Sequence, residues 1–460
     1  MVSRRSVPVR KLSLDKRLKT FEEVVLGYTE SEALEEAKRC LKCKLEPCSK
    51  ACPLNIDIAK FVEYIKERRF KKALEVILEK NPFPAITGRV CPQEVLCQRD
   101  CTLRKLGDPL AIGKLERFLG DYQIENNIMD LKVPEKVKGK VAIVGSGPAG
   151  LMGAVELRKL GYEVTIFEAL HEAGGVMVYG IPEFRLPRRV LRFYINYVKK
   201  LGVNIVLDSV IGKIFTIEEL LRDYDAVLLA TGAGTPKFLN IPGEELNGVY
   251  SANEFLIRIN LMKAYKFPYY DTPIKLGKRI AVVGGGNTAM DVSRIALRLG
   301  VEEVIVLYRR TEAEMPARRE EVENAKEEGV KFMLLTQPIA LIGDENGWVR
   351  KVKCIKMKLG KPDASGRRRP IPIPGSEFDV EVDNVVIAIG AEVNKLIQRT
   401  TPDLKVDRKG HVIVDEYGRT SIERVYAAGD VVTGAATVIE ALAAAKKVAH
   451  TIHRDLHGGD

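Results

Sequence analysis

Seven cysteines lie close together in the first quarter of the chain, where they could bind a metal centre. Thiolates at such short spacings can surround a metal from a single loop, and proline after a ligand is common in iron–sulfur loops. Zinc is the alternative, because four thiolates also form structural zinc sites. The eighth cysteine, Cys354, stands alone. The clustered cysteines are Cys40, Cys43, Cys48, Cys52-Pro53, Cys91-Pro92, Cys97 and Cys101.

These cysteines are not expected to form disulfides. Disulfide-rich domains are short and exported, whereas this chain has 460 residues and no apolar signal core after its basic start. An odd number of clustered cysteines cannot pair completely. We therefore expect metal binding in a reducing cytoplasm. The sequence contains no apolar run of about 18 residues, so no membrane helix is predicted.

A glycine-rich turn predicts a first dinucleotide site. Gly145-Ser146-Gly147-Pro148-Ala149-Gly150 directly follows the β-branched run 141–144. The first Gly of this pattern makes a tight turn, the second admits a pyrophosphate, and the third lets helix and strand pack closely. The helix then directs free N–H groups at phosphate. The next strand, 163–167, ends at Glu168, which suits the hydroxyls of an unphosphorylated ribose, as in FAD or NAD.

A second turn of this kind, Gly284-Gly285-Gly286-Asn287-Thr288-Ala289, follows the strand 279–283. Here the next strand, 303–308, ends at Arg309 and Arg310 instead of an acid. Guanidinium groups suit a 2′-phosphate, so this site is predicted to bind NADP. The alternative is that both arginines are solvated residues at a strand end.

The pattern of apolar residues predicts a helical iron–sulfur domain followed by two Rossmann-like dinucleotide-binding domains. The second of these is expected to be inserted in the first. Residues 56–78 have apolar positions at helical spacing, whereas strands and helices alternate after residue 140. The expected boundaries are 1–138 for the helical domain, 139–262 with 390–460 for the FAD-binding domain, and 263–389 for the NADP-binding domain.

The rest of the α/β region resembles flavin reductases with two dinucleotide domains. Ala230-Thr231-Gly232 follows one strand, and the strand at 425–428 runs into Gly429-Asp430 before a helix. The resemblance implies that Asp430 contacts the ribityl and phosphate part of FAD. It places Ala436, Thr437 and Val438 beside the flavin, where the positive helix end stabilises reduced flavin. No cysteine pair follows residue 101, so electrons are expected to leave the flavin through the first domain.

The whole chain is similar to the small subunit of glutamate synthase and equally to the large subunit of NADH-dependent ferredoxin:NADP oxidoreductase. The segments that carry this resemblance are 21–28, 39–43, 88–94, 111–118, 174–182 and 315–318. It implies Gly174, Gly175 and Val176 at the FAD site and Arg318 at the NADP site. It also implies two 4Fe-4S clusters, one on Cys40, Cys43, Cys48 and Cys101, the other on Cys52, Cys91, Cys97 and a non-cysteine ligand, for which Glu116 is the candidate.

Glu116 has an ordinary alternative as a surface acid of a helix, and a carboxylate on cluster iron is unusual. The expected activity is hydride exchange between NADPH and flavin with single electrons passing through the clusters, without a catalytic side chain. One interpretation is the glutamate synthase small subunit, which feeds glutamate formation in a large subunit. The others are the large subunit of the electron-bifurcating oxidoreductase (a transhydrogenase) and a non-enzymatic iron–sulfur regulatory protein.

The expected partners are proteins. They are a glutamate synthase large chain, a small flavin and 2Fe-2S subunit, a second copy of this chain, or ferredoxin. Position 2 is Val, and glutamine hydrolysis typically needs an amino-terminal Cys, so the chain alone is not expected to make glutamate from glutamine. The net charge of +11 comes from 73 basic residues dispersed among 62 acidic ones, which indicates a solvated surface rather than a nucleic-acid site. We expect no nucleic-acid or membrane partner.

Overall fold

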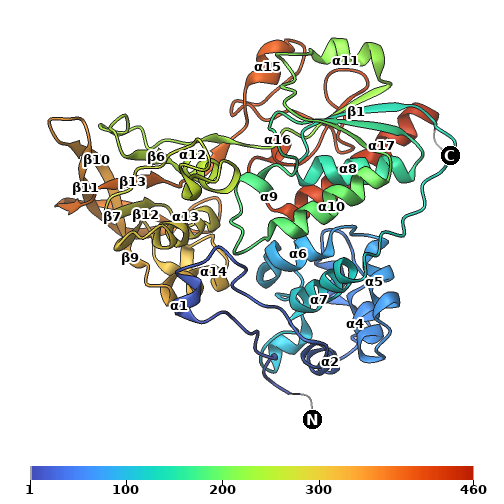
Figure 1. The fold of residues 1–460 in the computed structure, drawn as a ribbon, viewed down its shortest axis with the longest axis horizontal. Helices are drawn as coiled ribbons and strands as arrows, with labels where there is room; N and C mark the ends of the chain where they lie inside the picture. Colours follow the sequence, from blue (N-terminus) through green and yellow to red (C-terminus); the bar gives the residue numbers. More distant parts are fainter. Residues whose placement is uncertain (1–2, 459–460) are drawn as a thin grey trace.

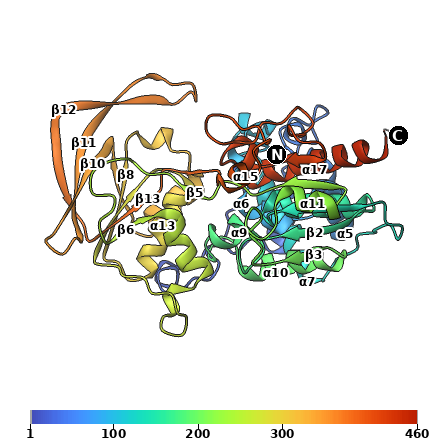
Figure 2. The same cartoon turned by 90° about the horizontal axis from the view of Figure 1, so that it is seen from above.

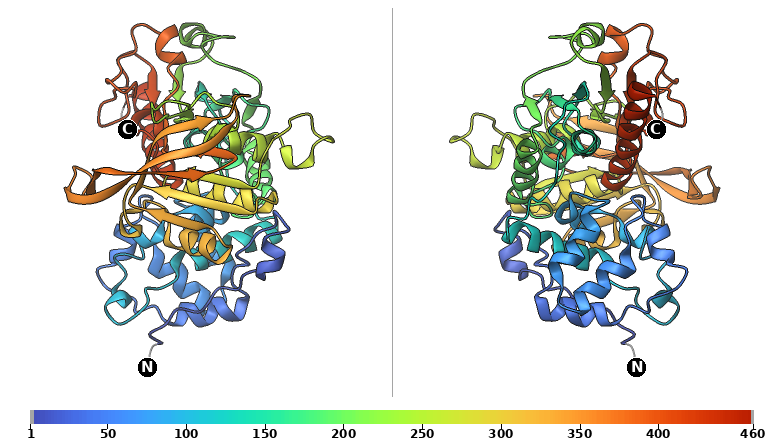
Figure 3. Two further views of the ribbon diagram at one scale, coloured as in Figure 1. Left: turned by 90° about the vertical axis from the view of Figure 1, so that its left-hand side faces the viewer. Right: turned by 90° about the vertical axis from the view of Figure 1, so that its right-hand side faces the viewer.

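The protein, seen in a computed structural model that describes residues 3–458, consists of a helical unit and two α/β units (Figure 1). The helical unit, blue to cyan, packs below the first α/β unit, whose segments are green and red. The second α/β unit, yellow and orange, lies beside both. Figure 3 shows from two further sides that the helical unit occupies one end of the molecule. Within residues 3–458, no helix has the length and apolar character needed to cross a membrane.

The helical unit buries its apolar faces in one core. The expected helix over 56–78 is two helices, because the chain turns at Arg68, whose φ is 56°. Phe61 and Ile65 from the first of these pack in the same core as Leu74 and Ile77 from the second. The elements are α1 (Leu14–Arg17), α2 (Glu30–Lys38), α3 (Pro47–Lys50), α4 (Ile58–Lys66), α5 (Phe70–Leu78), α6 (Pro84–Val90), η1 (Gln93–Val95), η2 (Thr102–Lys105) and α7 (Ile112–Glu125).

The first α/β unit is a parallel sheet in the order β15-β4-β1-β2-β3. Strand β15 comes from the end of the chain and pairs with β4, so the last segment completes the first sheet and the predicted insertion is confirmed. The strands are β1 (Lys140–Val144), β2 (Glu163–Phe167), β3 (Asn204–Val206), β4 (Ala226–Leu229) and β15 (Val425–Ala427). The helices are α8 (Pro148–Lys159), α9 (Val176–Tyr179), α10 (Arg188–Lys200), α11 (Ile217–Asp223), α15 (Leu396–Thr400), α16 (Asp430–Thr433) and α17 (Val438–His457).

The second α/β unit has a parallel sheet in the order β6-β13-β7-β8-β9 and an antiparallel sheet, β10-β11-β12 (Figure 2). Its parallel strands are β6 (Val249–Ser251), β7 (Arg279–Val283), β8 (Glu303–Tyr308), β9 (Lys331–Leu334) and β13 (Asn384–Ile387). The antiparallel strands are β10 (Thr336–Gly343), β11 (Val349–Pro362) and β12 (Arg368–Glu381). Its helices are α12 (Ala252–Leu256), η3 (Ile257–Leu261), η4 (Ala264–Lys266), α13 (Asn287–Arg298), η5 (Glu312–Glu314) and α14 (Arg319–Glu327).

The chain passes between the two α/β units twice. At these passages β5 (Thr235–Pro236) pairs with β14 (Ala391–Glu392) in a short antiparallel bridge. Strand β6 lies after the first passage and pairs with β13 in the second sheet. The second sheet therefore begins N-terminal to the boundary expected at residue 263. Strand β6 has only three residues, which are enough to pair with β13 but too few to give a periodic pattern in the sequence.

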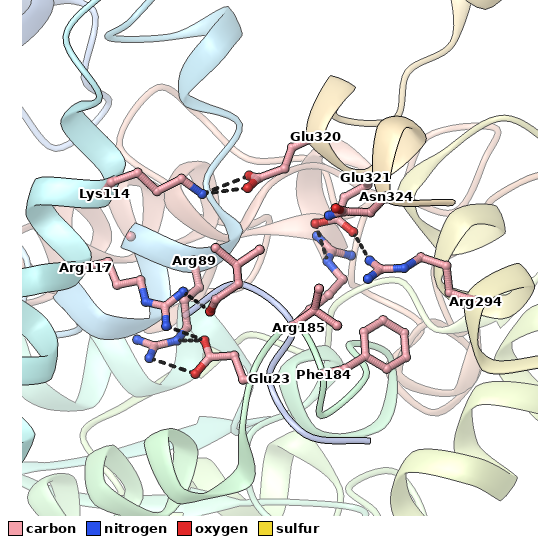
Figure 4. Close-up of a pocket in the computed structure, with 13 residues that line it drawn as sticks. Glu23, Arg89, Lys114, Arg117, Phe184, Arg185, Arg294, Glu320, Glu321 and Asn324 are labelled. Atoms are coloured by element: carbon pink, nitrogen blue, oxygen red, sulfur yellow. Dashed lines mark hydrogen bonds and ion pairs between the residues drawn. The ribbon is translucent and has the colours of Figure 1, made fainter. Parts of the chain in front are cut away.

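Buried ion pairs join all three units at their junction (Figure 4). The pairs include Glu23–Arg89 at 2.6 Å, Lys114–Glu320 at 2.7 Å and Arg185–Asp291 at 2.6 Å. Breaking a buried pair typically costs about 3–5 kcal/mol, because a charge is left without its partner. Lys114–Glu320 therefore holds the helical unit against the second α/β unit, and Arg185–Asp291 holds the two α/β units together.

Candidate functional site

The first glycine-rich turn has the shape that a bound pyrophosphate requires. Gly145 has a φ of 106°, and a Cβ there would meet the Ala230 carbonyl oxygen at 2.5 Å. A Cβ on Gly150 would overlap the Gly145 carbonyl oxygen. A Cβ on Gly147, in contrast, would meet no atom within 4 Å. The outer glycines are therefore needed by the fold, while Gly147 borders open space in front of α8, where Pro148 and Ala149 form the first turn.

Other predicted FAD residues come together around this turn. Gly174 donates its N–H to Ser146 Oγ at 2.9 Å, and a Cβ on Gly175 would meet Gly147 Cα at 2.7 Å. Val176 then begins α9 and is exposed. Thr231 and Gly232 follow β4, the neighbour of β1 in the sheet. Because both strands end at the same edge, these loops and the glycine turn surround one site.

Glu168 lies at the predicted place, directly after β2, and is buried. Its Oε2 accepts hydrogen bonds from the Ser146 N–H at 2.9 Å and the Ser146 hydroxyl at 2.5 Å. Its Oε1 accepts one from the Leu170 N–H at 2.9 Å. A carboxylate oxygen can accept two hydrogen bonds, so Oε1 retains a position for a ribose hydroxyl.

The last segment supplies an acid and a helix end to the same site. Gly429 has a φ of 79° and leads into Asp430, whose Oδ1 accepts the Ala436 N–H at 3.2 Å. Burial raises the pKa of Asp430 to about 6, although the Ala436 N–H opposes this. Helix α17 begins with a capping box in which Thr437 and Glu440 bond each other's backbone N–H. The first N–H of the helix, on Val438, has no partner within the helix and can serve a ligand.

Tyr179 lies beside the predicted FAD residues but carries no motif in the sequence. A Cβ on Gly234 would come within 3.4 Å of the Tyr179 hydroxyl, so this hydroxyl lies beside the loop that follows β4. Burial, together with the charges of Asp430 and Glu168, raises the pKa of Tyr179 to about 12. A hydroxyl between two acids of the FAD site could have been found only from the folded arrangement.

The second glycine-rich turn also leaves room for a nucleotide. A Cβ on Gly284 would overlap the Ala388 carbonyl oxygen, whereas one on Gly286 would meet only Pro316, at 3.9 Å. Asn287 and Thr288 begin α13 at this turn and are half-buried, while Ala289 is buried. The turn and the helix end therefore reproduce the phosphate-binding arrangement of the first unit.

The three arginines predicted for NADP lie in different surroundings. Arg309 is exposed, and no carboxylate within residues 3–458 forms an ion pair with it. Arg310 is buried and donates to Asp363 at 2.7 Å and to the Arg368 carbonyl at 2.8 Å. Arg318 is also buried and donates to the Arg89 carbonyl of the helical unit at 2.9 Å. Of the three, only Arg309 is free to meet a ligand.

The surroundings of the cysteines support the two ligand groups that the resemblance implies, and the grouping stays a prediction. Burial raises the pKa of Cys40 and Cys48, and Cys101 is among the nearby groups that raise it too. Cys43 Sγ lies 3.1 Å from the Thr102 hydroxyl. In the second group, burial raises the pKa of Cys97. The nearby groups Cys91, Cys52 and Glu116 raise this pKa as well. Within residues 3–458, no group of three or more Cys, His, Asp or Glu is arranged to hold a single metal ion. Each thiolate of a 4Fe-4S cluster binds a different iron, so such ligands need not converge on one point.

Glu116 is buried on α7, so it is not the surface acid that its helical position alone would allow. Its Oε1 accepts from the Thr87 hydroxyl at 2.6 Å and from Asn81 at 2.9 Å. Burial raises the pKa of Glu116 to about 7, while Thr87 and Asn81 oppose the shift. Its charge is among the causes that raise the pKa of all three thiols of this group, Cys52, Cys91 and Cys97. The donor set of three thiolates and one oriented carboxylate therefore fits the second group.

The loop of the second cysteine group follows a helix that packs against the first α/β unit. Helix α6 ends at Cys91 and packs against α10 and α17 of the first α/β unit. The Tyr194 hydroxyl of α10 accepts the Ala85 N–H of α6 at 3.1 Å and donates to Gln123 at 2.9 Å. Cys97 has Cys48 of the first group among its charged neighbours.

Both parts of the chain match known families. Residues 139–446 match the pyridine nucleotide-disulphide oxidoreductases. Residues 17–128 match dihydropyrimidine dehydrogenase domain II, a domain with a 4Fe-4S cluster. The match to FprA of Mycobacterium tuberculosis in complex with NADPH has a TM-score of 0.59 and 22% identity, and covers 69% of this chain and 84% of that one. At this identity the likeness concerns the fold alone.

Curated relatives match nearly the whole chain. The NADP(+)-dependent formate dehydrogenase subunit beta of Moorella thermoacetica is 40% identical over 440 residues, which are 90% of this chain. The chain spans 60% of that relative's length. The glutamate synthase (NADPH) small chain of Halomonas elongata is 37% identical over 434 residues, 93% of this chain and 91% of that one.

These matches identify an oxidoreductase rather than an iron–sulfur protein that only binds nucleotides. The larger match supplies FAD and NADP(H) as cofactors, and the smaller one supplies iron and sulfide in 4Fe-4S form. Both predicted cofactor regions, the glycine turns and the cysteine loops, fall inside the matched residues. The chain belongs to the pyridine nucleotide-disulphide oxidoreductase family and, within it, to the iron–sulfur flavoproteins that include the glutamate synthase small chains.

Proposed function

We propose that the chain takes electrons from NADPH and delivers them to a partner subunit, in the manner of a glutamate synthase small chain. The observation that carries this proposal is the packing of α6, which ends at Cys91, against α17, whose first turn faces the FAD site. This contact supports a short route for electrons between the proposed flavin and the proposed clusters. When bound, FAD supplies hydride chemistry toward NADPH and single-electron chemistry toward the clusters.

The roles proposed for the residues follow from their surroundings. Gly147 and the first turn of α8 receive the FAD pyrophosphate, and Glu168 accepts the ribose hydroxyls. Asp430 contacts the ribityl part, and the N-terminus of α17 directs its positive end at the flavin. The remaining FAD contacts are assigned to Gly145, Pro148, Ala149, Gly150, Gly174, Gly175, Val176, Thr231, Gly232, Gly429, Ala436, Thr437 and Val438. The NADP pyrophosphate is assigned to Gly284, Gly286, Asn287, Thr288 and Ala289.

Two 4Fe-4S clusters are proposed, one for each cysteine group. The first is held by Cys40, Cys43, Cys48 and Cys101. The second is held by Cys52, Cys91, Cys97 and Glu116, whose side chain is aligned by Thr87 and Asn81. The Leu110 N–H lies 3.5 Å from Cys101 Sγ and would stabilise the reduced form of the first cluster.

The partner is proposed from the names of the relatives. The Halomonas relative is named a small chain and the Moorella relative a subunit beta, so each is named as a part of a larger assembly. Glutamate formation would take place in a large subunit of the glutamate synthase type. A second candidate is electron delivery to NADP(+) in an assembly of the formate dehydrogenase type, favoured by the 40% identity to the Moorella subunit. We propose the reducing cytoplasm as the location of either assembly, because free thiols that ligate iron persist in a reducing compartment.

Reconstitution tests this proposal. The purified chain is mixed with a glutamate synthase large chain, and NADPH oxidation is followed with 2-oxoglutarate and glutamine present. The proposal predicts NADPH-dependent glutamate formation that requires both chains. Reduction of the chain by NADPH without glutamate formation would leave the electron route in place and exclude the glutamate synthase partner.

A further inference from the structure

Of the two arginines predicted to bind the 2′-phosphate, Arg309 is free, whereas Arg310 is already bonded within the protein. Arg309 and Arg310 both follow β8, where an acid would hold an unphosphorylated ribose. Arg310 is 5% exposed and is bonded to the turn between β11 and β12. A second cation for the phosphate must therefore come from elsewhere.

The turn that Arg310 holds is itself rigid and carries an arginine. Between β11 and β12, the Asp363 N–H donates to the Arg367 carbonyl at 2.8 Å and the Gly366 N–H to the Asp363 carbonyl at 2.9 Å. Asp363 Oδ1 accepts the Ser365 N–H at 2.9 Å. Arg367 donates its Nε to Ser365 Oγ at 3.0 Å. This fixes the base of the guanidinium and leaves its two terminal amino groups available.

Arg310 fixes the turn over the end of β8. Its Nη2 bonds Asp363 Oδ2 at 2.7 Å, its Nε bonds the Arg368 carbonyl at 2.8 Å, and its own carbonyl accepts the Leu335 N–H at 3.1 Å. The long ribbon of β11 and β12 is seen in Figure 2, where it extends away from the parallel sheet. The hydrogen bonds from Arg310 hold the turn of this ribbon near the end of β8, beside the proposed nucleotide site.

The charges around Arg309 are unbalanced. Burial lowers the pKa of Arg309, and the neighbouring charges of Arg310 and Arg367 lower it further. Asp363 is the acid that opposes this shift, and it is already paired with Arg310. Within residues 3–458, neither Arg309 nor Arg367 forms an ion pair. Arg310, the neighbour of Arg309, bonds Asp363 and the Arg368 carbonyl on either side of Arg367, so both unpaired arginines lie near the end of β8.

We propose that Arg309 and Arg367 together bind the 2′-phosphate of NADP(H), and that Arg310 is a positioning residue that holds Arg367 in place through Asp363. The inference rests on the proposed NADP site and names its specificity-determining residues. Two guanidinium groups suit a dianionic phosphate, since each can donate paired hydrogen bonds to its oxygens. Arg367 lies 58 residues beyond Arg309, which is why the strand-end motif does not reveal it.

The test is calorimetric binding of 2′,5′-ADP, NADP(+) and NAD(+) to the intact holoenzyme, without turnover. Arg367→Ala should weaken 2′,5′-ADP and NADP(+) at least about tenfold, as loss of a charge-assisted hydrogen bond does, and leave NAD(+) unchanged. Arg309→Ala should act in the same way, and Arg367→Lys should recover part of the affinity. Arg399→Ala, which removes an exposed arginine of the first α/β unit, is the control for net charge.

The variant Asp363→Asn distinguishes an Arg310 that positions the turn from an Arg310 that binds the phosphate itself. If Arg310 only positions the turn, Asp363→Asn should weaken 2′,5′-ADP as Arg310→Ala does, and the double variant should lose no more than either single one. Tighter binding by Asp363→Asn, or full affinity in Arg367→Ala, would overturn the inference. Equal affinity of the unaltered protein for NADP(+) and NAD(+) would instead contradict the proposed NADP site itself.

Discussion

Arg318 of the second α/β unit donates a hydrogen bond of 2.9 Å to the carbonyl of Arg89, two residues before Cys91 in the helical unit. Its own N–H donates to Asn287 Oδ1 at 3.0 Å, at the start of α13. Burial raises the pKa of the Cys91 thiol, and the Arg318 guanidinium is a nearby cation that opposes this. One residue therefore joins the nucleotide turn to the loop of the second cysteine group.

Arg318→Ala should make the reduction potential of the second cluster more negative. A cation close to a cluster stabilises the extra electron, and about 1 kcal/mol of lost attraction corresponds to roughly 40 mV for one electron. A redox titration followed by electron paramagnetic resonance measures this. Arg318→Lys keeps the charge and should keep the potential; if both variants shift equally, the charge of Arg318 is not the cause.

Glu116→Gln should alter the second cluster alone. A neutral amide binds iron more weakly than a carboxylate, so we expect lower iron content or a changed resonance signal for that cluster. The first cluster should be unaffected. Glu125→Gln, at the exposed end of the same helix, provides the matched control. Full iron content with an unchanged spectrum in Glu116→Gln would show that Glu116 is no ligand.

Gly147→Ala should fold but fail to retain FAD. Its Cβ would meet no protein atom within 4 Å and its φ of −67° suits alanine, so the added methyl group obstructs only the pyrophosphate. Gly150→Ala should instead destabilise the fold, because its Cβ would overlap the Gly145 carbonyl. FAD content and circular dichroism of the two proteins measure the difference. Normal FAD content in Gly147→Ala would contradict the assigned pyrophosphate position.

Glu156→Gln should lower the free energy of unfolding by about 2 kcal/mol at neutral pH. Burial opposes ionisation of Glu156, but His450, Lys159 and Lys446 outweigh it and lower its pKa from 4.5 to about 2. A lowered pKa stabilises the fold above pH 4.5, and this contribution is lost as the pH falls from 4.5 toward 2.

The difference between the unaltered protein and Glu156→Gln should therefore persist between pH 7 and 5. Thermal unfolding at several pH values in this range tests it. A difference that shrinks before the pH reaches 5 would contradict a lowered pKa of Glu156.

Local features of the site could be predicted from the sequence. The turns at Gly145 and Gly284 follow directly from strand, glycine and helix in succession, so nothing distant decides them. The position of Glu168 directly after β2 also follows from the sequence, since the strand length fixes where the next side chain lies.

Features that depend on distant contacts could not be predicted. Arg310 reads as a ligand in the sequence, yet its partner Asp363 lies 53 residues away in a turn without a motif. Arg318 contacts Gln93 across 225 residues and two units of the fold. Burial of Glu116 depends on Thr87 and Asn81, which the helix pattern of α7 does not reveal.

The most direct test of the electron route is anaerobic titration of the purified chain with NADPH, followed by visible absorption and electron paramagnetic resonance. The proposed route predicts bleaching of the flavin band together with signals of reduced 4Fe-4S clusters, at lower concentrations of NADPH than of NADH. A flavin that bleaches while the clusters stay oxidised at every NADPH concentration, even with a lower-potential reductant able to reduce them separately, would contradict it.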